Sequence, residues 1–494
     1  MIAPDRLVAT TVRLAGPGSG FDAADIDLLA AAGPGGVIWQ HQGDGLAGRG
    51  TALRLELPAG LDAPGAADSV AAVLAAIPAT GDLDGPGRGP VAIGALPFAA
   101  GAPGHLVVPE VIVGRHDGDA WLTVVAPPGQ DPSVDPRQVR AEARRLAPPA
   151  ASPALPSQFT LTSVMEHADW KALVARTVED LRAGGLSKVV LARRVDVEAN
   201  RPFVIPDVLG RLLALYPTCM VWSIDGFIGA SPELLIARRG DQVSSLPLAG
   251  TVPRSGDVEA DEALVAGLLR SPKQLAEHGY VIDGLCTALE RYCLELDVPD
   301  KPSILELRNV SHLATPVTGT LAPRAAGPGE RGRATAGPGE PARGRATGDG
   351  AFWSRLGSAD DLSESPWRRA AGVAPRANGV GPAGGHPALA VPSALELVAA
   401  VHPTAAVGGT PTAEAVSYLT EVEGFDRGRY AGPVGWMDAR GDGTWAIGLR
   451  SADVNGNRAS LYAGVGVVEG SEPAAELTET QLKLQALLAA LVRP

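Results

Sequence analysis

Alternating apolar and polar residues dominate the C-terminal part of the chain. The alternation covers 430–438, 444–453 and 459–468, with glycine-rich turns between the runs, and a period of two is typical of half-buried strands. Shorter apolar runs predict further strands at 219–225, 232–238 and 243–247. Consecutive strands joined by short turns are expected to pair antiparallel.

Three segments show the 3.6-residue spacing of helices instead: 165–184, 272–295 and 473–492. The second has a clear start, because Ser271 can cap it and Pro272 suits its first position. Gln274 completes a Ser-x-x-Gln capping box. Helices that flank long antiparallel strand runs indicate an α+β fold.

Residues 323–390 differ from the rest of the chain in composition. Gly-Pro-Gly-Glu and Arg-Gly-Arg-Ala-Thr each occur twice in this segment, which has few residues to bury. We expect a disordered insertion, and a basic tail for RNA or a partner is the alternative. The remaining parts are residues 1–155, which consist of strands and Gly/Pro turns, and the segments 156–322 and 391–494.

Charge and composition exclude several classes of protein. The 494 residues include 42 Lys and Arg against 55 Asp and Glu, a net charge of −13. Nucleic-acid binding is not expected, because it needs a basic surface. No apolar run approaches roughly 18 residues, so no membrane span is expected. Three cysteines are too few for a disulfide framework, which favours free thiols and a cytoplasmic protein.

Two charged residues stand where apolar strands begin. Lys188 opens the run Lys-Val-Val-Leu-Ala, and Glu233 precedes a second apolar run. Each has an ordinary explanation: a lysine at a strand edge and a solvated carboxylate at a strand end. In a shared site, however, an amine and a carboxylic acid could act as base and acid.

Two predicted helices carry carboxylates that could bind a metal. Glu476, Glu479 and Lys483 are three and four residues apart and share one helical face, although a solvated face with ion pairs would look the same. The earlier helix carries Glu277 and His278 without a His-Glu-x-x-His motif, and Glu277 alone could be a surface residue. Two carboxylates from separate helices suit Mg²⁺, which prefers hard oxygen ligands.

The last predicted strands leave room for a ligand. Gly464 and Gly466 lie in one of them, where the missing side chains allow close approach to the backbone. Arg450 alternates with Ala446 and Gly448, so we expect its guanidinium above small side chains, where it could hold a carboxylate. A buried structural ion pair would explain Arg450 equally well.

Taken in order, these segments resemble the chorismate-utilising enzymes, which include isochorismate, salicylate, anthranilate and aminodeoxychorismate synthases. The matching segments are Ser187–Arg193, Ile228–Leu235, Leu246–Thr251, Ser271–His278, His402–Gly409, Gly424–Trp436, Tyr462–Val468 and Glu476–Thr480. The resemblance implies one large chorismate-binding domain with two stacked antiparallel sheets flanked by helices. Residues 1–155 resemble the more variable N-terminal half of that fold, notably at Ile93–Phe98.

The resemblance also implies a role for each candidate residue. Lys188 matches the base that activates water for attack at C2 of chorismate, and Glu233 matches the acid that protonates the departing C4 hydroxyl. Glu277 and Glu479 match Mg²⁺ ligands, with Glu476 close by as a candidate third. Substrate contacts are expected from Thr251, Tyr430, Arg450, Lys483 and the backbone amides around Gly464 and Gly466.

Two positions separate the members of this family. Ammonia-using members commonly carry Gln at the position of Lys188, and aminodeoxychorismate synthases carry a lysine at the position of Ala249. Lys188 together with Ala249 therefore implies water as the nucleophile and isochorismate as the product. The resemblance of Val310–Gly319 implies that this product is used for menaquinone biosynthesis. A salicylate synthase that goes on to eliminate pyruvate, a siderophore-pathway isochorismate synthase and an inactive scaffold remain as alternatives. Chorismate is the expected partner, and the protein is expected to be a monomer or a weak homo-oligomer.

Overall fold

Three β-sheets frame the computed structural model, which describes residues 6–81, 83–129, 135–143, 154–324 and 391–492. Neighbouring strands pair antiparallel except β1 and β5, which run parallel. The largest sheet has the order β10 (Phe159–Ser163), β11 (Lys188–Ala199), β25 (Arg458–Val467), β24 (Ser451–Asn455), β13 (Phe227–Ser231), β12 (Met220–Ile224), β2 (Val37–His41), β3 (Asp44–Arg49), β8 (Val111–His116), β9 (Asp119–Ala126), β1 (Val8–Ala15) and β5 (Ala79–Gly81), with β21 (Gly409–Thr410) beside β11.

The other two sheets are smaller. The second has the order β17 (Cys293–Asp297), β20 (Val317–Leu321), β15 (Gln242–Leu246), β14 (Leu234–Arg239), β23 (Gly443–Ile447), β22 (Pro433–Asp438), β6 (Val91–Ala95), β7 (Gly104–Val108) and β4 (Leu53–Leu57). The third consists of β16 (Leu248–Pro253), β19 (Val310–Ala314) and β18 (Ser303–Glu306).

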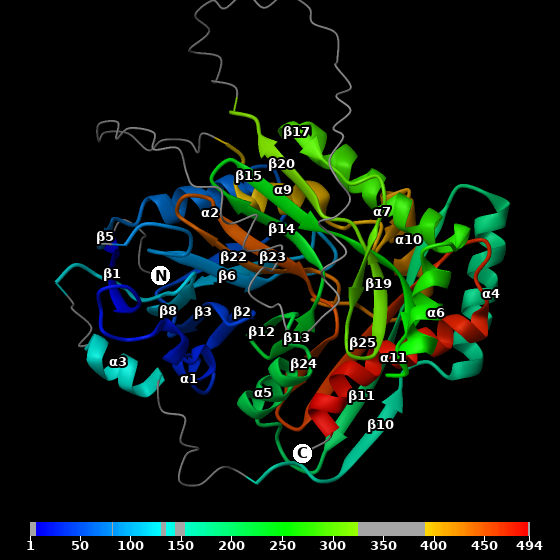
Figure 1. Ribbon diagram of the computed structural model, residues 1–494, viewed down its shortest axis with the longest axis horizontal. Coiled ribbons are helices and arrows are strands. Elements are labelled where there is room, and N and C mark those ends of the chain that lie inside the picture. The colour runs from blue at the N-terminus through cyan, green and yellow to red at the C-terminus, as the bar shows by residue number, and fades with distance from the viewer. Residues whose placement is uncertain (1–5, 82, 130–134, 144–153, 325–390, 493–494) are drawn as a thin grey trace, which may run out of the picture.

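Helices cover the outside of these sheets (Figure 1). Their bounds are α1 (Leu28–Ala32), α2 (Ala66–Ala75), α3 (Pro136–Ala143), α4 (His167–Ala183), α5 (Ile205–Leu215), α6 (Val258–Leu268), α7 (Pro272–Glu290), α9 (Ala394–Val401), α10 (Thr412–Val422) and α11 (Pro473–Val492). The helices α4 and α11 lie against β25 of the largest sheet, and α9 lies against β14, β22 and β23. No helix among the described residues is long and apolar enough to cross a membrane.

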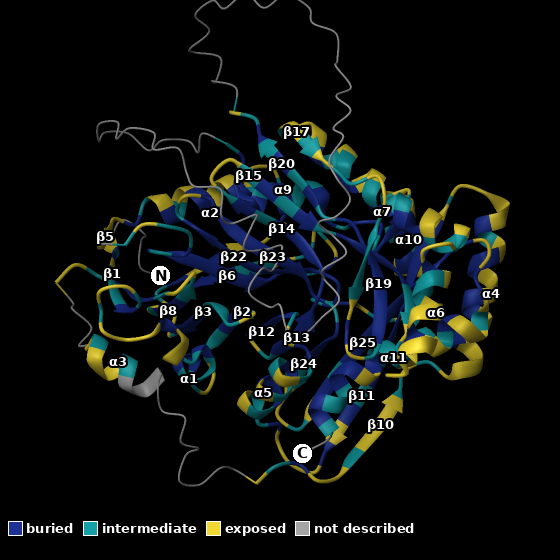
Figure 2. Ribbon diagram, in the orientation of Figure 1, coloured by how far each residue is buried: buried dark blue, intermediate teal, exposed yellow. Residues whose placement is uncertain are grey.

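The two larger sheets share one hydrophobic core. Trp222 of the largest sheet and Trp445 of the second are each fully buried and belong to the same cluster. Figure 2 shows the buried strands at the centre and exposed helix faces outside. Large aromatic side chains bury much apolar area, so a few of them hold the sheets together in a chain with few aromatic residues.

The N-terminal part is built into both large sheets. Trp39 of β2 is the register partner of Trp222 in β12, and Ile93 of β6 is the partner of Trp436 in β22. Strands before residue 155 therefore pair directly with strands that come after it.

The structure confirms the α+β fold with stacked antiparallel sheets and adds the small third sheet. Two element boundaries differ from the prediction. The helix expected at 272–295 ends at Glu290, and Cys293 already opens β17. The strand expected at 444–453 is divided into β23 and β24. Residues 325–390 of the predicted insertion lie outside the described residues.

Candidate active site

A pocket lies where β11, β25, α7 and α11 meet the three-stranded sheet. Its empty space is about 770 Å³, the open mouth included. It is lined by Lys188, Val190, Pro232, Glu233, Leu248, Ala249, Gly250, Thr251, Glu277, His312, Ala406, Val407, Tyr430, Ala431, Leu449, Arg450, Tyr462, Ala463, Gly464, Gly466, Glu479 and Lys483. Every predicted site residue except Glu476 is among them, although the chain positions span 188 to 483.

Lys188 opens β11 three residues after Gly185, the second of two glycines that follow α4. Gly184 and Gly185 have φ values of 96° and 94°, which glycine adopts without steric cost, so the chain leaves the helix and enters the strand within a few residues. The Lys188 side chain is 1% exposed, and its Nζ lies 3.2 Å from Oε1 of Glu277. The pocket therefore contains a buried amine with a carboxylate neighbour.

Gly466 of β25 makes this pairing possible. It is the register partner of Val190, on the strand that Lys188 begins. A Cβ at this position would lie 2.1 Å from Oε1 of Glu277 and 2.9 Å from Cε of Lys188. The missing side chain thus leaves the space that the carboxylate and the lysine stem occupy.

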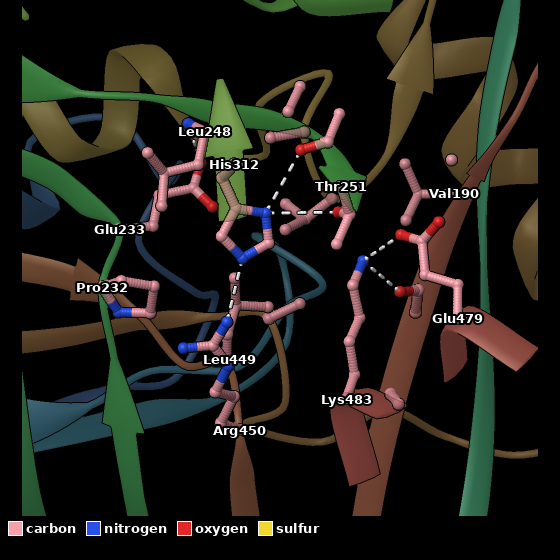
Figure 3. Close-up of a pocket in the computed structure, with 18 of the residues that line it drawn as sticks. Val190, Pro232, Glu233, Leu248, Thr251, His312, Leu449, Arg450, Glu479 and Lys483 are labelled. Atoms are coloured by element: carbon pink, nitrogen blue, oxygen red, sulfur yellow. Dashed lines mark hydrogen bonds and ion pairs between the residues drawn. The ribbon is translucent and has the colours of Figure 1, made fainter. Parts of the chain in front are cut away.

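Glu233 lies between β13 and β14, at the opposite side of the pocket from Glu479 (Figure 3). Its backbone N–H donates to Oγ of Ser231 at 3.2 Å, and the Leu248 N–H lies 3.5 Å from its carboxylate. Burial raises the pKa of Glu233 to about 7, against the lowering effect of the Leu248 N–H and nearby cations. A carboxyl group with this pKa holds a proton for part of the time at neutral pH, so it can serve as an acid.

Glu277 of α7 and Glu479 of α11 both point into the pocket, and Glu277 is only 9% exposed. Nζ of Lys483 forms an ion pair with Oε1 of Glu479 at 2.8 Å and donates a hydrogen bond to the Gly464 carbonyl at 3.0 Å (Figure 3). The alternative interpretation of Glu277 as a surface residue is therefore wrong. The helix spacing that joins Glu479 and Lys483 on one face is also the spacing that brings both into the pocket.

Glu476 lies on the same helix but is not among the lining residues. Its buried carboxylate pairs with Lys273 of α7 at 3.1 Å. Burial and the neighbouring Glu479 carboxylate raise the pKa of Glu476. In this structure Glu476 connects α11 to α7.

Arg450 lines the pocket, but it does not occupy a strand as the alternation predicted. It lies between β23 and β24 with a φ of 47°, a left-handed conformation that costs energy for a side chain other than glycine. The predicted placement on one strand face with Ala446 is therefore wrong. The break between the strands turns the guanidinium toward His312 instead (Figure 3).

His312 was not predicted as a site residue. Its Nε2 accepts from Arg450 at 2.9 Å, so its Nδ1 carries the proton and lies 3.2 Å from both the Gly250 carbonyl and the Thr251 hydroxyl. Burial and the Arg450 charge lower the pKa of His312 well below its usual value. The ring is neutral and orients both Arg450 and Thr251. The sequence signal for it was its position within Val310–Gly319, a stretch that resembles the family.

Two stacked tyrosines close another side of the pocket. The rings of Tyr430 and Tyr462 lie 5.1 Å apart between centroids. Burial raises the pKa of Tyr430 above its usual value, so its hydroxyl keeps its proton and can donate. A Cβ at Gly464 would lie 2.8 Å from that hydroxyl, so Gly464 admits the tyrosine hydroxyl against the β25 backbone.

The arrangement combines acid–base groups with groups that bind anions. Lys188 and Glu233 could move protons at one bound molecule. Arg450, Lys483 and the Tyr430 hydroxyl are donors suited to carboxylates. Such a pocket fits a small polycarboxylate whose conversion needs both a base and an acid.

The chain matches a family model described as chorismate binding enzyme over residues 36–326 and 389–492. It belongs to this family of chorismate-binding enzymes. The isochorismate synthase DhbC of Bacillus subtilis is 30% identical over 413 residues, which cover 81% of this chain and 81% of that protein. The isochorismate synthase EntC of Escherichia coli K12 is 28% identical over 406 residues, again 81% of each chain. MenF, the menaquinone-specific isochorismate synthase from Escherichia coli, shares the fold with a TM-score of 0.67 at 23% identity, over 99% of this chain and 95% of that one.

Proposed function

We propose that this protein is an isochorismate synthase, which converts chorismate to isochorismate by adding water at C2 and releasing the C4 hydroxyl. The observation that carries the proposal is the pairing of a buried amine, Lys188, with a protonatable acid, Glu233, in one pocket. Related isochorismate synthases in the family support it.

Lys188 and Glu233 divide the proton transfers between them. Lys188 takes a proton from the attacking water as the new C2–O bond forms, and the ring double bonds shift. Glu233 gives a proton to the C4 oxygen as the C4–O bond breaks, so the leaving group departs as water. Substrate and product are isomers, and solvent returns one proton to Glu233 and removes one from Lys188 between turnovers.

Ala249 supports water as the only nucleophile. It lines the pocket on β16, and its methyl group can form no bond to the ring. A side-chain amine at this position would allow a covalent intermediate. With Ala249 there, this position supplies no nucleophile to compete with water.

We assign the substrate carboxylates to the donors around the pocket. Arg450, Lys483 and Tyr430 line the pocket with Gly464 and Gly466, and their charged, hydroxyl and backbone amide donors would bind these carboxylates. Arg450 is held by His312, so its guanidinium is oriented before the substrate arrives. Thr251, which contacts the same histidine, is a further lining group.

We propose Mg²⁺ as the cofactor, with Glu277 and Glu479 as its protein ligands. Both carboxylates line the same pocket, and their oxygens are the hard donors that this ion prefers. Mg²⁺ often takes only one or two protein carboxylates and keeps several waters, so two glutamates are enough to hold it. The ion would neutralise a substrate carboxylate and orient the ring.

Product analysis tests the proposed function. Purified protein is incubated with chorismate and Mg²⁺, and the products are separated by chromatography over time. We expect isochorismate alone, in equilibrium with chorismate. Salicylate and pyruvate as the main products would assign a salicylate synthase instead. The absence of any turnover, with chorismate still bound, would favour an inactive scaffold.

We further propose that the isochorismate serves menaquinone biosynthesis in the cytoplasm. The support is the resemblance of Val310–Gly319 and the free state of all three cysteines, as in a reducing compartment. Deleting the gene in its source organism is expected to lower the menaquinone content. Unchanged menaquinone with loss of a catechol siderophore would assign the other pathway.

A further inference from the structure

Glu423 and Arg427 form a buried ion pair just outside the pocket. Glu423 caps the C-terminus of α10, and Arg427 follows four residues later. Both side chains are at most 4% exposed. Nε of Arg427 donates to Oε2 of Glu423 at 2.8 Å, and Nη2 donates to Oε1 at 2.5 Å. Neither residue lines the pocket.

The ion pair fills a gap along one edge of β11. Strand β21 pairs with Lys188 and Val189, and β10 pairs with β11 only from Val195 onward. Between these two partners, the Val190 carbonyl accepts from Nη2 of Arg427 at 2.5 Å, and the Ala192 N–H donates to Oε1 of Glu423 at 2.7 Å. Buried backbone groups need such partners. The two side chains therefore continue the hydrogen-bond ladder where no strand does.

Arg427 also reaches two other walls of the pocket. Its Nη1 donates to the Val407 carbonyl at 2.7 Å. Its guanidinium carbon lies 4.4 Å from the centre of the Phe98 ring and 6.0 Å from that of Tyr430. Val190, Val407 and Tyr430 all line the pocket. One buried cation thus connects three lining segments from behind.

We propose that Arg427, held by Glu423, is a positioning residue for the reaction, which sets the start of β11, and with it Lys188, against Val407 and Tyr430. The inference rests on the proposed function, in which Lys188 is the base. A planar guanidinium can satisfy several acceptors in fixed directions, whereas a lysine ammonium is a point charge on a flexible stem. The three carbonyl and carboxylate partners of Arg427 use this geometry.

The substitution Arg427→Lys in the full chain tests the proposal, because it keeps the buried positive charge and removes the planar guanidinium with its fixed donor directions. We expect kcat to fall on the order of 10- to 100-fold, since small displacements of a catalytic group have effects of this size. Chorismate binding, measured by equilibrium titration, is expected to change by no more than about twofold, since ground-state contacts remain. A loss in kcat without a loss in binding separates positioning from general damage.

Arg238→Lys is the matched control. Arg238 of β14 is a buried arginine paired with Asp442 at 3.6 Å, and neither residue lines the pocket. We expect this variant to lower the melting temperature and leave kcat unchanged. If Arg427→Lys keeps the wild-type kcat, or if its kcat falls no further than that of Arg238→Lys, the positioning role is refuted.

A second variant decides the matter if Arg427→Lys does not fold. In Glu423→Gln the amide oxygen can still accept from Ala192, but the charge that orients Arg427 is gone. A lower kcat with retained chorismate binding supports the proposal, and an unchanged kcat overturns it. Wild-type protein measured in parallel separates the two claims. Wild type without turnover removes the proposed function, whereas active wild type with fully active variants removes only the positioning role.

Discussion

At the scale of single residues, burial decides what each charged side chain of the pocket can do. Glu233 and Glu479 have the same carboxylate group. Glu233 is nearly fully buried and has its pKa raised to about 7, whereas Glu479 is partly exposed and lies 2.8 Å from Lys483. The Glu233 carboxyl group is therefore suited to donate a proton, and the Glu479 carboxylate is suited to bind a metal cation.

The raised pKa of Glu233 predicts the pH dependence of turnover. Only the protonated carboxyl can give a proton to the departing hydroxyl, so kcat should fall as the pH rises through about 7. In Glu233→Gln this limb should disappear, and kcat should drop by roughly 10²- to 10⁴-fold. Rate profiles of both proteins across neutral pH check the prediction. A wild-type profile without a falling limb near pH 7 would contradict the acid role.

Gly466 offers a second test at this scale. A methyl group there would lie 2.1 Å from the Glu277 carboxylate and 2.9 Å from Cε of Lys188, so Gly466→Ala should displace both groups. We expect a loss of kcat on the order of 100-fold with little change in the melting temperature. Gly470→Ala is the control, because a Cβ at Gly470 meets nothing within 4 Å. Equal activity of the two variants would show that the gap at Gly466 is not needed.

At the scale of elements, the proposed metal site depends on two helices far apart in sequence. The helix α7 brings Glu277, and α11 brings Glu479. Ser271 helps define where α7 begins, since its hydroxyl accepts from the Gln274 N–H, as the predicted cap required. Lys273 and Glu476 connect the same two helices at 3.1 Å. The helix ends and this ion pair fix the relative placement of the two carboxylates.

This arrangement predicts different results for two neighbouring glutamates. Glu479→Gln should raise the Mg²⁺ concentration for half-maximal activity by roughly 10-fold or more, because a neutral amide is a weaker ligand for a hard cation. Glu476→Gln should change the metal requirement much less, since Glu476 contacts Lys273 and does not line the pocket. Activity titrated with Mg²⁺, with melting curves in parallel, measures both. Identical titration curves for Glu479→Gln and wild type would remove Glu479 from the ligand set.

At the scale of the whole molecule, the predicted insertion is expected to be dispensable for catalysis. Arg324 before it contacts Glu396 of α9 and lies 2.9 Å from Asp68 of α2. The two ends of the chain around 325–390 are therefore close together. The family match also passes over residues 327–388.

Replacing residues 325–390 by a short Gly/Ser linker tests this expectation. Turnover and melting temperature should stay at the wild-type values, because closing the shorter connection costs little and leaves the described contacts intact. Steady-state kinetics and thermal unfolding of the deletion variant provide the measurement. A large loss of kcat would mean that the insertion takes part in the reaction, and a selective loss of partner binding would make it an interaction element.

The sequence by itself determined much of the fold and the set of candidate residues. Strand alternation and helix spacing depend on local periodicity, so β25, α7 and α11 were predictable from it. The ordered motifs named Lys188, Glu233, Glu277 and Glu479, because the family resemblance connects residue types to roles. The product, the metal and the pathway stay predictions.

Only the tertiary structure decided which of these residues meet and in what state. The turn at Arg450 could not be predicted from the sequence, because the alternation of side chains continues through the left-handed residue that separates β23 from β24. His312 and the Glu423–Arg427 pair act through contacts between segments distant in sequence. Burial sets the pKa of Glu233, and burial is a property of the packed chain. Local patterns follow from neighbouring residues, whereas a site depends on the packing of distant ones.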